Sequence, residues 1–229
     1  MTIKQTTKVN INNKIDAIFI KIIPILYHKK SLKETRNRGF YGKGRLLRLL
    51  VFFVIMKVMK SYNTLNDYYR ELFGEKTFKV PIDAGFDCPN RDGTVAHGGC
   101  TFCTVSGSGD AIVAPDAPIR EQFYKEIDFM HRKWPDVKKY LVYFQNFTNT
   151  HEKVEVIRER YEQAINEPGV VGINIGTRPD CLPDETIEYL AELSERMHVT
   201  VELGLQTTFE ATSDLINRAH SYELYVETV

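Results

Sequence analysis

The 229-residue sequence predicts an α/β fold in which about four βα units build a parallel sheet. The first observation is an alternation. From Ser61 onward, short β-rich runs are followed by segments whose apolar residues recur at helical spacing. The second is that the β-rich runs are almost continuously apolar, as expected of parallel strands covered on both faces. In such a sheet, functional groups gather at the carboxyl ends of the strands.

Four strands are predicted from runs rich in β-branched and aromatic residues. They are Thr77–Ile82, Tyr140–Phe144, Val170–Ile175 and Val199–Leu205. The pattern alone does not distinguish a barrel from an open, doubly wound sheet.

Five helices are predicted from apolar residues three and four positions apart. The second ends before Trp134–Pro135, the third ends at Pro168–Gly169, and the fourth begins with Asp184 as its N-cap. In order, the helices are Leu65–Leu72, Ile119–Lys133, Val154–Asn166, Asp184–Met197 and Phe209–Asn217.

Charge divides the chain near residue 60. Residues 1–60 contain 14 Lys and Arg against 2 Asp and Glu, a net charge of +12, whereas residues 61–229 contain 16 against 28, a net charge of −12. We interpret residues 1–58 as a basic, poorly ordered N-terminal extension and residues 59–229 as the folded core. The alternative interpretation of the extension is an arm that binds nucleic acid or a membrane surface.

The sequence predicts a cytoplasmic protein without a membrane partner. The longest apolar run, Leu49–Met56, is far shorter than the ~20 residues of a membrane span, and no small-residue cleavage site follows it. Three of the four cysteines lie within sixteen positions. In a reducing compartment such crowding indicates a metal site or catalysis rather than disulfides.

The three clustered cysteines lie in a polar, Gly-rich loop directly after the first predicted strand. The segment Phe86–Cys103 reads FDCPNRDGTVAHGGCTFC, and Cys88, Cys100 and Cys103 follow the spacing C-x11-C-x2-C. Iron–sulfur clusters are normally held by four thiolates, so three would leave one iron open for another ligand. On spacing alone a zinc site is equally compatible, because His97 completes a Cys3His set. Simple burial of the three cysteines is disfavoured in such a loop.

Five motifs, each at a strand end or in the following loop, resemble the radical S-adenosylmethionine superfamily. In particular they resemble its bacterial YtqA/YhcC-type group, which is related to the elongator catalytic subunit and the anaerobic coproporphyrinogen oxidases. The resemblance runs from about Met59 to the last residue. The motifs are CPNRDGT…GGCTFC, YFQNFTNT (Tyr143–Thr150), IGTRPDCLPDE (Ile175–Glu185), VELGLQT (Val201–Thr207) and LINRAHS (Leu215–Ser221).

The resemblance implies a radical enzyme with a [4Fe–4S] cluster held by Cys88, Cys100 and Cys103. Its open iron would bind S-adenosylmethionine, and one electron would cleave this cofactor to methionine and a 5′-deoxyadenosyl radical that abstracts hydrogen from the substrate. The electron would come from a donor such as flavodoxin or ferredoxin. Cys181 is interpreted as structural and His97 as a loop residue, so neither is expected to be a ligand.

The resemblance also implies cofactor-binding residues, by motif position, after the second and third strands and on or after the fourth. They are Gln145, Asn146, Thr177, Arg178, Glu202 and Gln206.

The superfamily core is a partial (β/α) barrel of six units, so four units imply a chain that is incomplete at its C-terminus. The relation to the elongator subunit implies transfer RNA as substrate, modified at the C5 side chain of the wobble uridine. The alternatives are a small-molecule or cofactor-pathway substrate, an inactive truncated remnant, or a zinc-binding module.

Overall fold

The computed structural model describes residues 62–107 and 112–229. The predicted basic extension, residues 1–58, lies outside these residues, so its boundary stays a prediction. The described residues divide after Gly74 into two units.

The first unit contains the helix α3, Leu65–Phe73. Its N-cap is Thr64, whose side chain accepts from the amide of Asp67, while the Asp67 carboxylate accepts from the Thr64 amide. This capping box satisfies two backbone donors that a helix start leaves open. The helix ends at Gly74, which adopts the left-handed conformation with φ of 78°.

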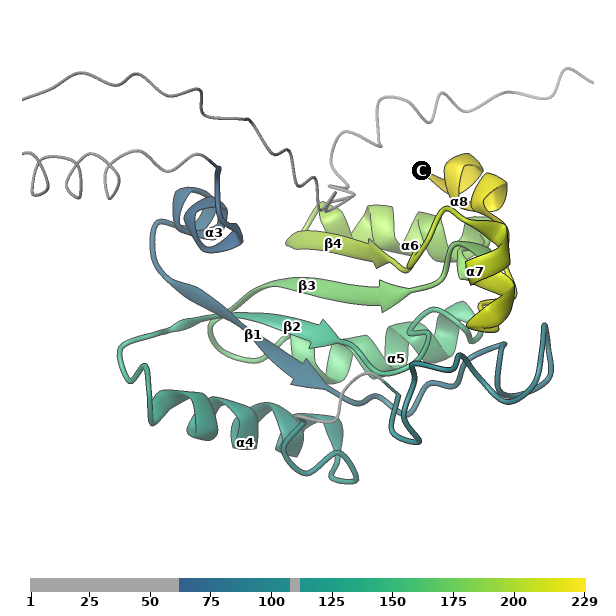
Figure 1. The fold of residues 1–229 in the computed structure, drawn as a ribbon. Helices are drawn as coiled ribbons and strands as arrows, with labels where there is room; N and C mark the ends of the chain where they lie inside the picture. The colour runs from purple at the N-terminus through teal and green to yellow at the C-terminus, as the bar shows by residue number, and fades with distance from the viewer. Residues whose placement is uncertain (1–61, 108–111) are drawn as a thin grey trace, which may run out of the picture. The chain divides into compact units, whose positions relative to one another are not determined.

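The second unit is built on a parallel sheet whose strand order is β1-β2-β3-β4 within the described residues. All four strands point toward the same edge, where the cysteine loop, α7 and α8 lie (Figure 1). The α/β prediction is therefore confirmed, and the predicted strand boundaries differ by two residues at most. The strands are β1 Thr77–Ile82, β2 Lys139–Phe144, β3 Val170–Thr177 and β4 His198–Leu203.

Helices connect the strands in the predicted βα order. The prediction of Asp184 as an N-cap is wrong: Pro183 caps α6 without a side-chain hydrogen bond, and Asp184 begins the helix itself. A carboxylate in the first turn still interacts favourably with the helix dipole. The helices are α4 Ile119–His131, α5 Val154–Ile165, α6 Asp184–Ser194, α7 Glu210–Leu215 and α8 Tyr222–Thr228, with the 3-10 turn η1 at Pro179–Cys181.

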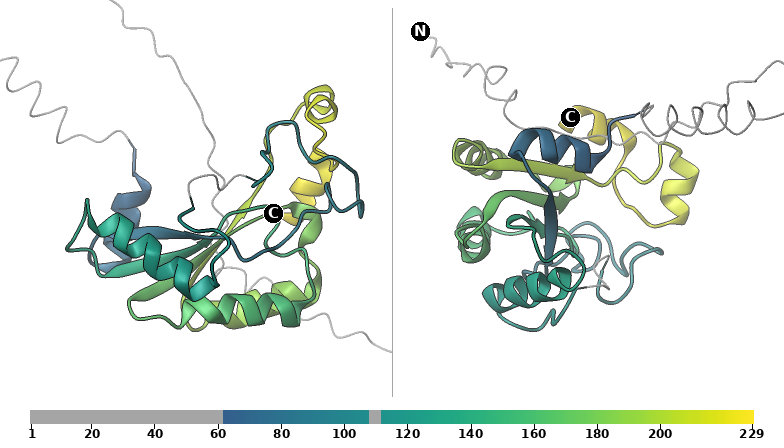
Figure 2. Two further views of the ribbon diagram at one scale, coloured as in Figure 1. Left: turned by 90° about the horizontal axis from the view of Figure 1, so that it is seen from below. Right: turned by 90° about the vertical axis from the view of Figure 1, so that its left-hand side faces the viewer.

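One face of the sheet packs against α4, α5 and α6, which lie along the same side of it (Figure 2, right). The strands contribute a fully buried row across this face, Val80, Val142, Ile173 and Val199. The helices pack apolar and aromatic side chains against this row, among them Phe123, Tyr161 and Leu193. Burial of this surface is the main source of stability for the unit.

The opposite face carries polar side chains, at the alternate positions of the same strands. Lys79 of β1 forms an ion pair with Glu202 of β4, although these are the outermost strands of the described sheet. In a flat sheet strands three steps apart would be about 14 Å apart. The contact therefore requires the sheet to curve toward its polar face, as in a partial (β/α) barrel.

Within the described residues, no helix combines the length and the apolar character that crossing a membrane requires.

Candidate metal centre

The cysteine loop, residues 87–107, begins at the carboxyl edge of the sheet, a few residues after β1. Its first half is a tight turn in which the amides of Arg91 and Asp92 donate to the Cys88 carbonyl, at 2.8 and 3.1 Å. The Gly99 amide donates to the carbonyl of Asn90 at 2.8 Å, which folds the loop back on itself. Cys88 and Cys100 thereby lie at the two ends of this folded segment, one at the start of its first arm and the other at the end of its second arm.

The thiols of the loop interact with one another. The amide of Cys103 donates to the Cys100 carbonyl at 3.0 Å, which brings the two thiols within reach of a sulfur–sulfur hydrogen bond. This hydrogen bond is the main reason that the pKa of Cys100 is lowered to about 6, and it raises the pKa of the donor Cys103. Cys88 lies close enough for its charge to raise the pKa of Cys103 as well. Metal ligation requires thiolates, and the lowered pKa makes Cys100 easier to deprotonate than an ordinary thiol.

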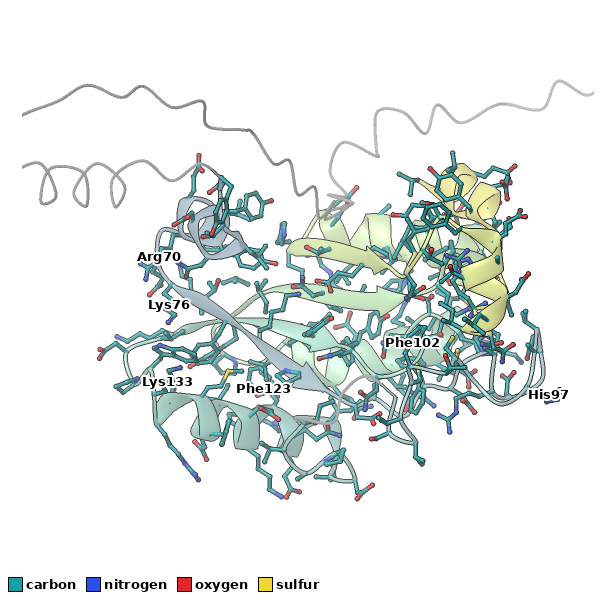
Figure 3. The ribbon with its side chains drawn as sticks, in the orientation of Figure 1. Arg70, Lys76, His97, Phe102, Phe123 and Lys133 are labelled. Carbon is teal, nitrogen blue, oxygen red and sulfur yellow. The ribbon has the colours of Figure 1, made fainter. Side chains whose placement is uncertain are left out.

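Three sulfur donors on one loop are the soft ligand set that iron–sulfur clusters require, so the residues fit such a group. Among the described residues no three or more His, Cys, Asp and Glu side chains are arranged to hold a metal ion. This holds for the three cysteines alone as well as for the Cys3His set that the spacing allows, and His97 lies exposed at the outer end of the loop (Figure 3).

Two buried guanidinium groups lie near the cysteines. Arg178, directly after β3, pairs with Asp180 at 2.6 Å and donates to the Arg218 carbonyl at 2.8 Å. Arg218 donates to backbone carbonyls, including that of Thr207 at 2.6 Å. The charges of both guanidinium groups help to lower the pKa of Cys100. They would favour an anionic group held by the thiolates.

The predicted residues after β2 and β3 join the strand ends to one another. Asn146 is buried and donates to the Asp83 carboxylate at 2.6 Å, which links β2 to the residue after β1. Thr177 shares a hydrogen bond of 2.5 Å with Thr150. Gln145 is half-buried directly after β2. The structure thus brings Asn146, Thr177 and Arg178 to one edge, where they hold the loops that surround the cysteines.

Glu202 lies on the polar, concave face rather than at the loop. It accepts from Tyr143 at 2.9 Å and from Asn174 at 3.2 Å, in addition to its ion pair with Lys79. Burial alone would raise the pKa of Glu202, but these three partners outweigh it and the pKa is lowered. Lys79 also lies 4.1 Å from the centre of the Tyr143 ring. The four side chains form what we call the concave-face cluster.

Gln206 is placed differently from Glu202. Its side chain is exposed, and its backbone adopts the left-handed conformation with φ of 58°. Glu202 and Gln206 thus lie on separate surfaces, one on the concave face and one on the turn after β4.

Cys181 is buried in η1, and its pKa is raised to about 12, chiefly by burial. It lies in the turn after β3, outside the cysteine loop.

A cleft of about 950 Å³ separates the cysteine loop from α8. Both walls are acidic, and Glu152, Glu185 and Glu227 have no ion-pair partner among the described residues. The lining includes Asp87, Asp92, Glu152, Asp180, Glu185 and Glu227.

Sequence reasoning missed several residues near the site. The sequence patterns predict Lys79 and Tyr143 only as parts of strands. The charge of Lys79 inside an apolar run nevertheless indicates a residue that needs a partner. Asn90, Asn217 and Arg218 lie inside recognised motifs, but nothing in their local pattern indicates their contacts.

Three proteins similar in sequence each match more than two thirds of this chain. The chain is 58% identical over 170 residues to the uncharacterized protein YtqA of Bacillus subtilis, 74% of this chain and 52% of that protein. It is 38% identical over 174 residues to protein YhcC of Escherichia coli, 76% of this chain and 55% of that protein. A protein of Methanocaldococcus jannaschii, MJ0486, is 32% identical over 165 residues, 71% and 49% of the two chains.

The chain therefore spans about half the length of the curated relatives that it matches. The family model of the radical SAM superfamily matches residues 91–229, from just after Cys88 to the last residue. Since this match covers more than half of the sequence and agrees with the parallel βα architecture, the chain belongs to the radical SAM superfamily.

Proposed function

We propose that this chain is the cluster-binding part of a radical S-adenosylmethionine enzyme. Cys88, Cys100 and Cys103 would hold a [4Fe–4S] cluster at the carboxyl edge of the sheet. When bound there, the reduced cluster supplies the electron that cleaves S-adenosylmethionine to methionine and a 5′-deoxyadenosyl radical. The observation that carries the proposal is the set of three free thiols on one loop, where the Cys100 sulfur accepts from Asn90 at 3.3 Å close to the buried guanidinium groups of Arg178 and Arg218.

The chain's own residues have separable tasks in this proposal. Arg178 and Arg218 place positive charge near the thiolates, which opposes their protonation. Asn146 and Thr177 fix the loops at the strand ends through buried hydrogen bonds. Glu202 is held ionised by Lys79 on the concave face, where it can accept hydrogen bonds from a bound cofactor or substrate.

Anaerobic purification of the full chain tests the metal centre. A brown protein with about four irons and four sulfides per chain is expected. Cys100→Ala should lose most of the iron, whereas Cys181→Ala, the matched control, should keep it because Cys181 lies in η1 and not in the cysteine loop. A colourless protein that binds zinc instead would overturn the proposal.

Production of 5′-deoxyadenosine tests the chemistry separately. The iron-loaded chain, given dithionite and S-adenosylmethionine, should release 5′-deoxyadenosine, and Cys100→Ala should not. A chain that holds the cluster but releases none would be an inactive remnant.

For the substrate we propose transfer RNA, modified at the C5 side chain of the wobble uridine. The support is the resemblance of the motifs to the elongator catalytic subunit. The basic residues 1–60 could bind the phosphates. Deletion of the gene should remove a wobble-uridine nucleoside detected by mass spectrometry, and an unchanged nucleoside profile would contradict this assignment.

A small-molecule or cofactor-pathway substrate is the second candidate. It is favoured by the net charge of −12 over residues 61–229 and by the acidic cleft beside the cysteine loop, because both repel RNA phosphates. The cytoplasmic location and the flavodoxin or ferredoxin donor stay predictions of the sequence.

A further inference from the structure

The LINRAHS motif forms a turn that contacts the cysteine loop directly. The turn, residues 216–220, follows α7. The amide of Thr101 donates to the Ile216 carbonyl at 3.0 Å. The side chain of Asn217 donates to the carbonyls of His97 and Gly99, at 3.0 and 2.8 Å. The segments joined in this way are about 120 residues apart in the sequence.

Asn217 is suited to this contact by its backbone as well as by its amide. Its φ is 54°, a left-handed conformation that Asn tolerates better than most residues other than Gly. In this conformation both donors of one side-chain amide reach two carbonyls of the cysteine loop. Gly99 directly precedes Cys100 in the chain, and His97 lies three positions before it. The two bonds therefore fix the arm that presents this cysteine.

Asn90 connects the same turn to a sulfur atom. Its side chain is fully buried and its amide donates to the Cys100 Sγ at 3.3 Å and to the Asn217 carbonyl. Its Oδ1 atom has no hydrogen-bond partner among the described residues. Donation to a ligand sulfur stabilises negative charge on it, and such hydrogen bonds are one of the factors that set the reduction potential of iron–sulfur clusters.

The turn is itself held rigidly. Arg178 donates to the Arg218 carbonyl at 2.8 Å, and the Arg218 amide donates to the Ser213 carbonyl at 3.0 Å. Because Arg178 directly follows β3, the turn is anchored to the sheet edge. The cysteine loop is therefore held against an element that is itself anchored to the sheet.

We propose that Asn217 and Asn90 are positioning residues of the metal centre. Asn217 fixes the loop arm that presents Cys100, and Asn90 donates a hydrogen bond to its sulfur. This inference rests on the proposed iron–sulfur function. It assigns two different consequences: loss of the Asn217 side chain loosens the metal centre, whereas loss of the Asn90 amide makes the cluster harder to reduce.

The experiment uses the full chain loaded with iron and sulfide under anaerobic conditions. Asn217→Gly keeps the left-handed backbone but loses both donors, and should release iron to a ferrous chelator about 10-fold faster than the unsubstituted chain. Asn90→Ala should lower the midpoint potential measured by a spectroscopic redox titration. A tenfold change in the reduction equilibrium corresponds to about 59 mV for one electron.

Asn166→Gly is the matched control. Asn166 caps α5, and among the described residues its side chain bonds only to Glu162 of the same helix, so neither iron release nor potential should change. Asn217→Asp, which keeps the shape without the donors, should repeat the effect of Asn217→Gly. If the unsubstituted chain binds no cluster, the proposed function fails. If it binds one and the Asn217 and Asn90 variants behave like Asn166→Gly, only the positioning inference fails. Variants that do not fold would overturn it too, since the residues would then support the whole unit.

Discussion

The two faces of the sheet use the same four strands for different purposes. On the helix-covered face, Val80, Val142 and Ile173 lie in a fully buried row, and their burial stabilises the unit. On the concave face, Lys79, Tyr143, Asn174 and Glu202 meet in the concave-face cluster. A partly buried ion pair contributes little net stability, because the desolvation of its charges offsets their attraction. Stability thus accounts for the residues of the first face but not for the charged and polar residues of the second.

The largest effect is expected on the helix-covered face. Ile173→Ala removes a fully buried side chain from a central strand and should lower the free energy of unfolding by about 2–5 kcal/mol. Urea unfolding followed by circular dichroism measures it. Ile187→Ala on α6, where the side chain is 39% exposed, is the control and should cost far less. Equal losses for the two variants would contradict the assignment of this face as the core.

A smaller effect is expected in the concave-face cluster. Lys79→Met leaves the Glu202 carboxylate without its cation and should cost about 1–3 kcal/mol at neutral pH. The pKa of Glu202 is lowered below 4.5 in the folded chain. Its contribution is therefore present above that pH and is lost as the pH falls through the lowered pKa, so the difference between the two chains should shrink in acid.

The double variant Lys79→Met/Glu202→Gln separates the causes of that loss. If the cost of Lys79→Met arises from an unpaired carboxylate, removal of the charge should restore part of the stability. A double variant that is less stable than Lys79→Met would contradict this explanation.

The smallest effect is expected outside both faces, where Arg158 of α5 meets Glu192 of α6 at 2.8 and 3.1 Å. Both side chains are largely exposed, so solvent screens the pair. Glu192→Gln should shift the urea midpoint less than Lys79→Met does, and the shift should vanish at high salt. A shift as large as that of Lys79→Met would erase the distinction between the cluster and an ordinary surface pair.

The contrast between the faces also explains what could be predicted. Strand positions and the parallel order follow from local patterns, because burial of each strand is visible in its own residues. The concave-face cluster was not predicted, since Lys79 and Glu202 are 123 positions apart and meet only because the sheet curves. Curvature is a property of all the strands together. The prediction of Asp184 as an N-cap is wrong for a different reason. Pro183 occupies the cap position, and Asp184 lies in the first turn of the helix.

The candidate site divides in a similar way. Cys88, Cys100 and Cys103 could be proposed from the sequence because metal ligands of one loop leave a spacing that can be read directly, and their role as ligands stays a prediction. Asn217 and Asn90 were not found, because an Asn that donates to distant carbonyls looks in sequence like any turn residue. Arg178 was predicted to bind the cofactor by motif position, which stays a prediction, whereas its buried pairing with Asp180 and its contact with the Arg218 carbonyl required the structure.

The contact between Asn217 and the cysteine loop has a consequence for synthesis of the chain. Gly99 precedes Asn217 by 118 positions, so the ribosome adds this loop residue roughly 6–24 s before it adds its partner. During this interval the three thiols are present on the nascent chain without the turn that later holds them. Under the proposed iron–sulfur function, delivery of iron and sulfide should therefore be productive only after β4, α7 and Asn217 have emerged from the ribosome.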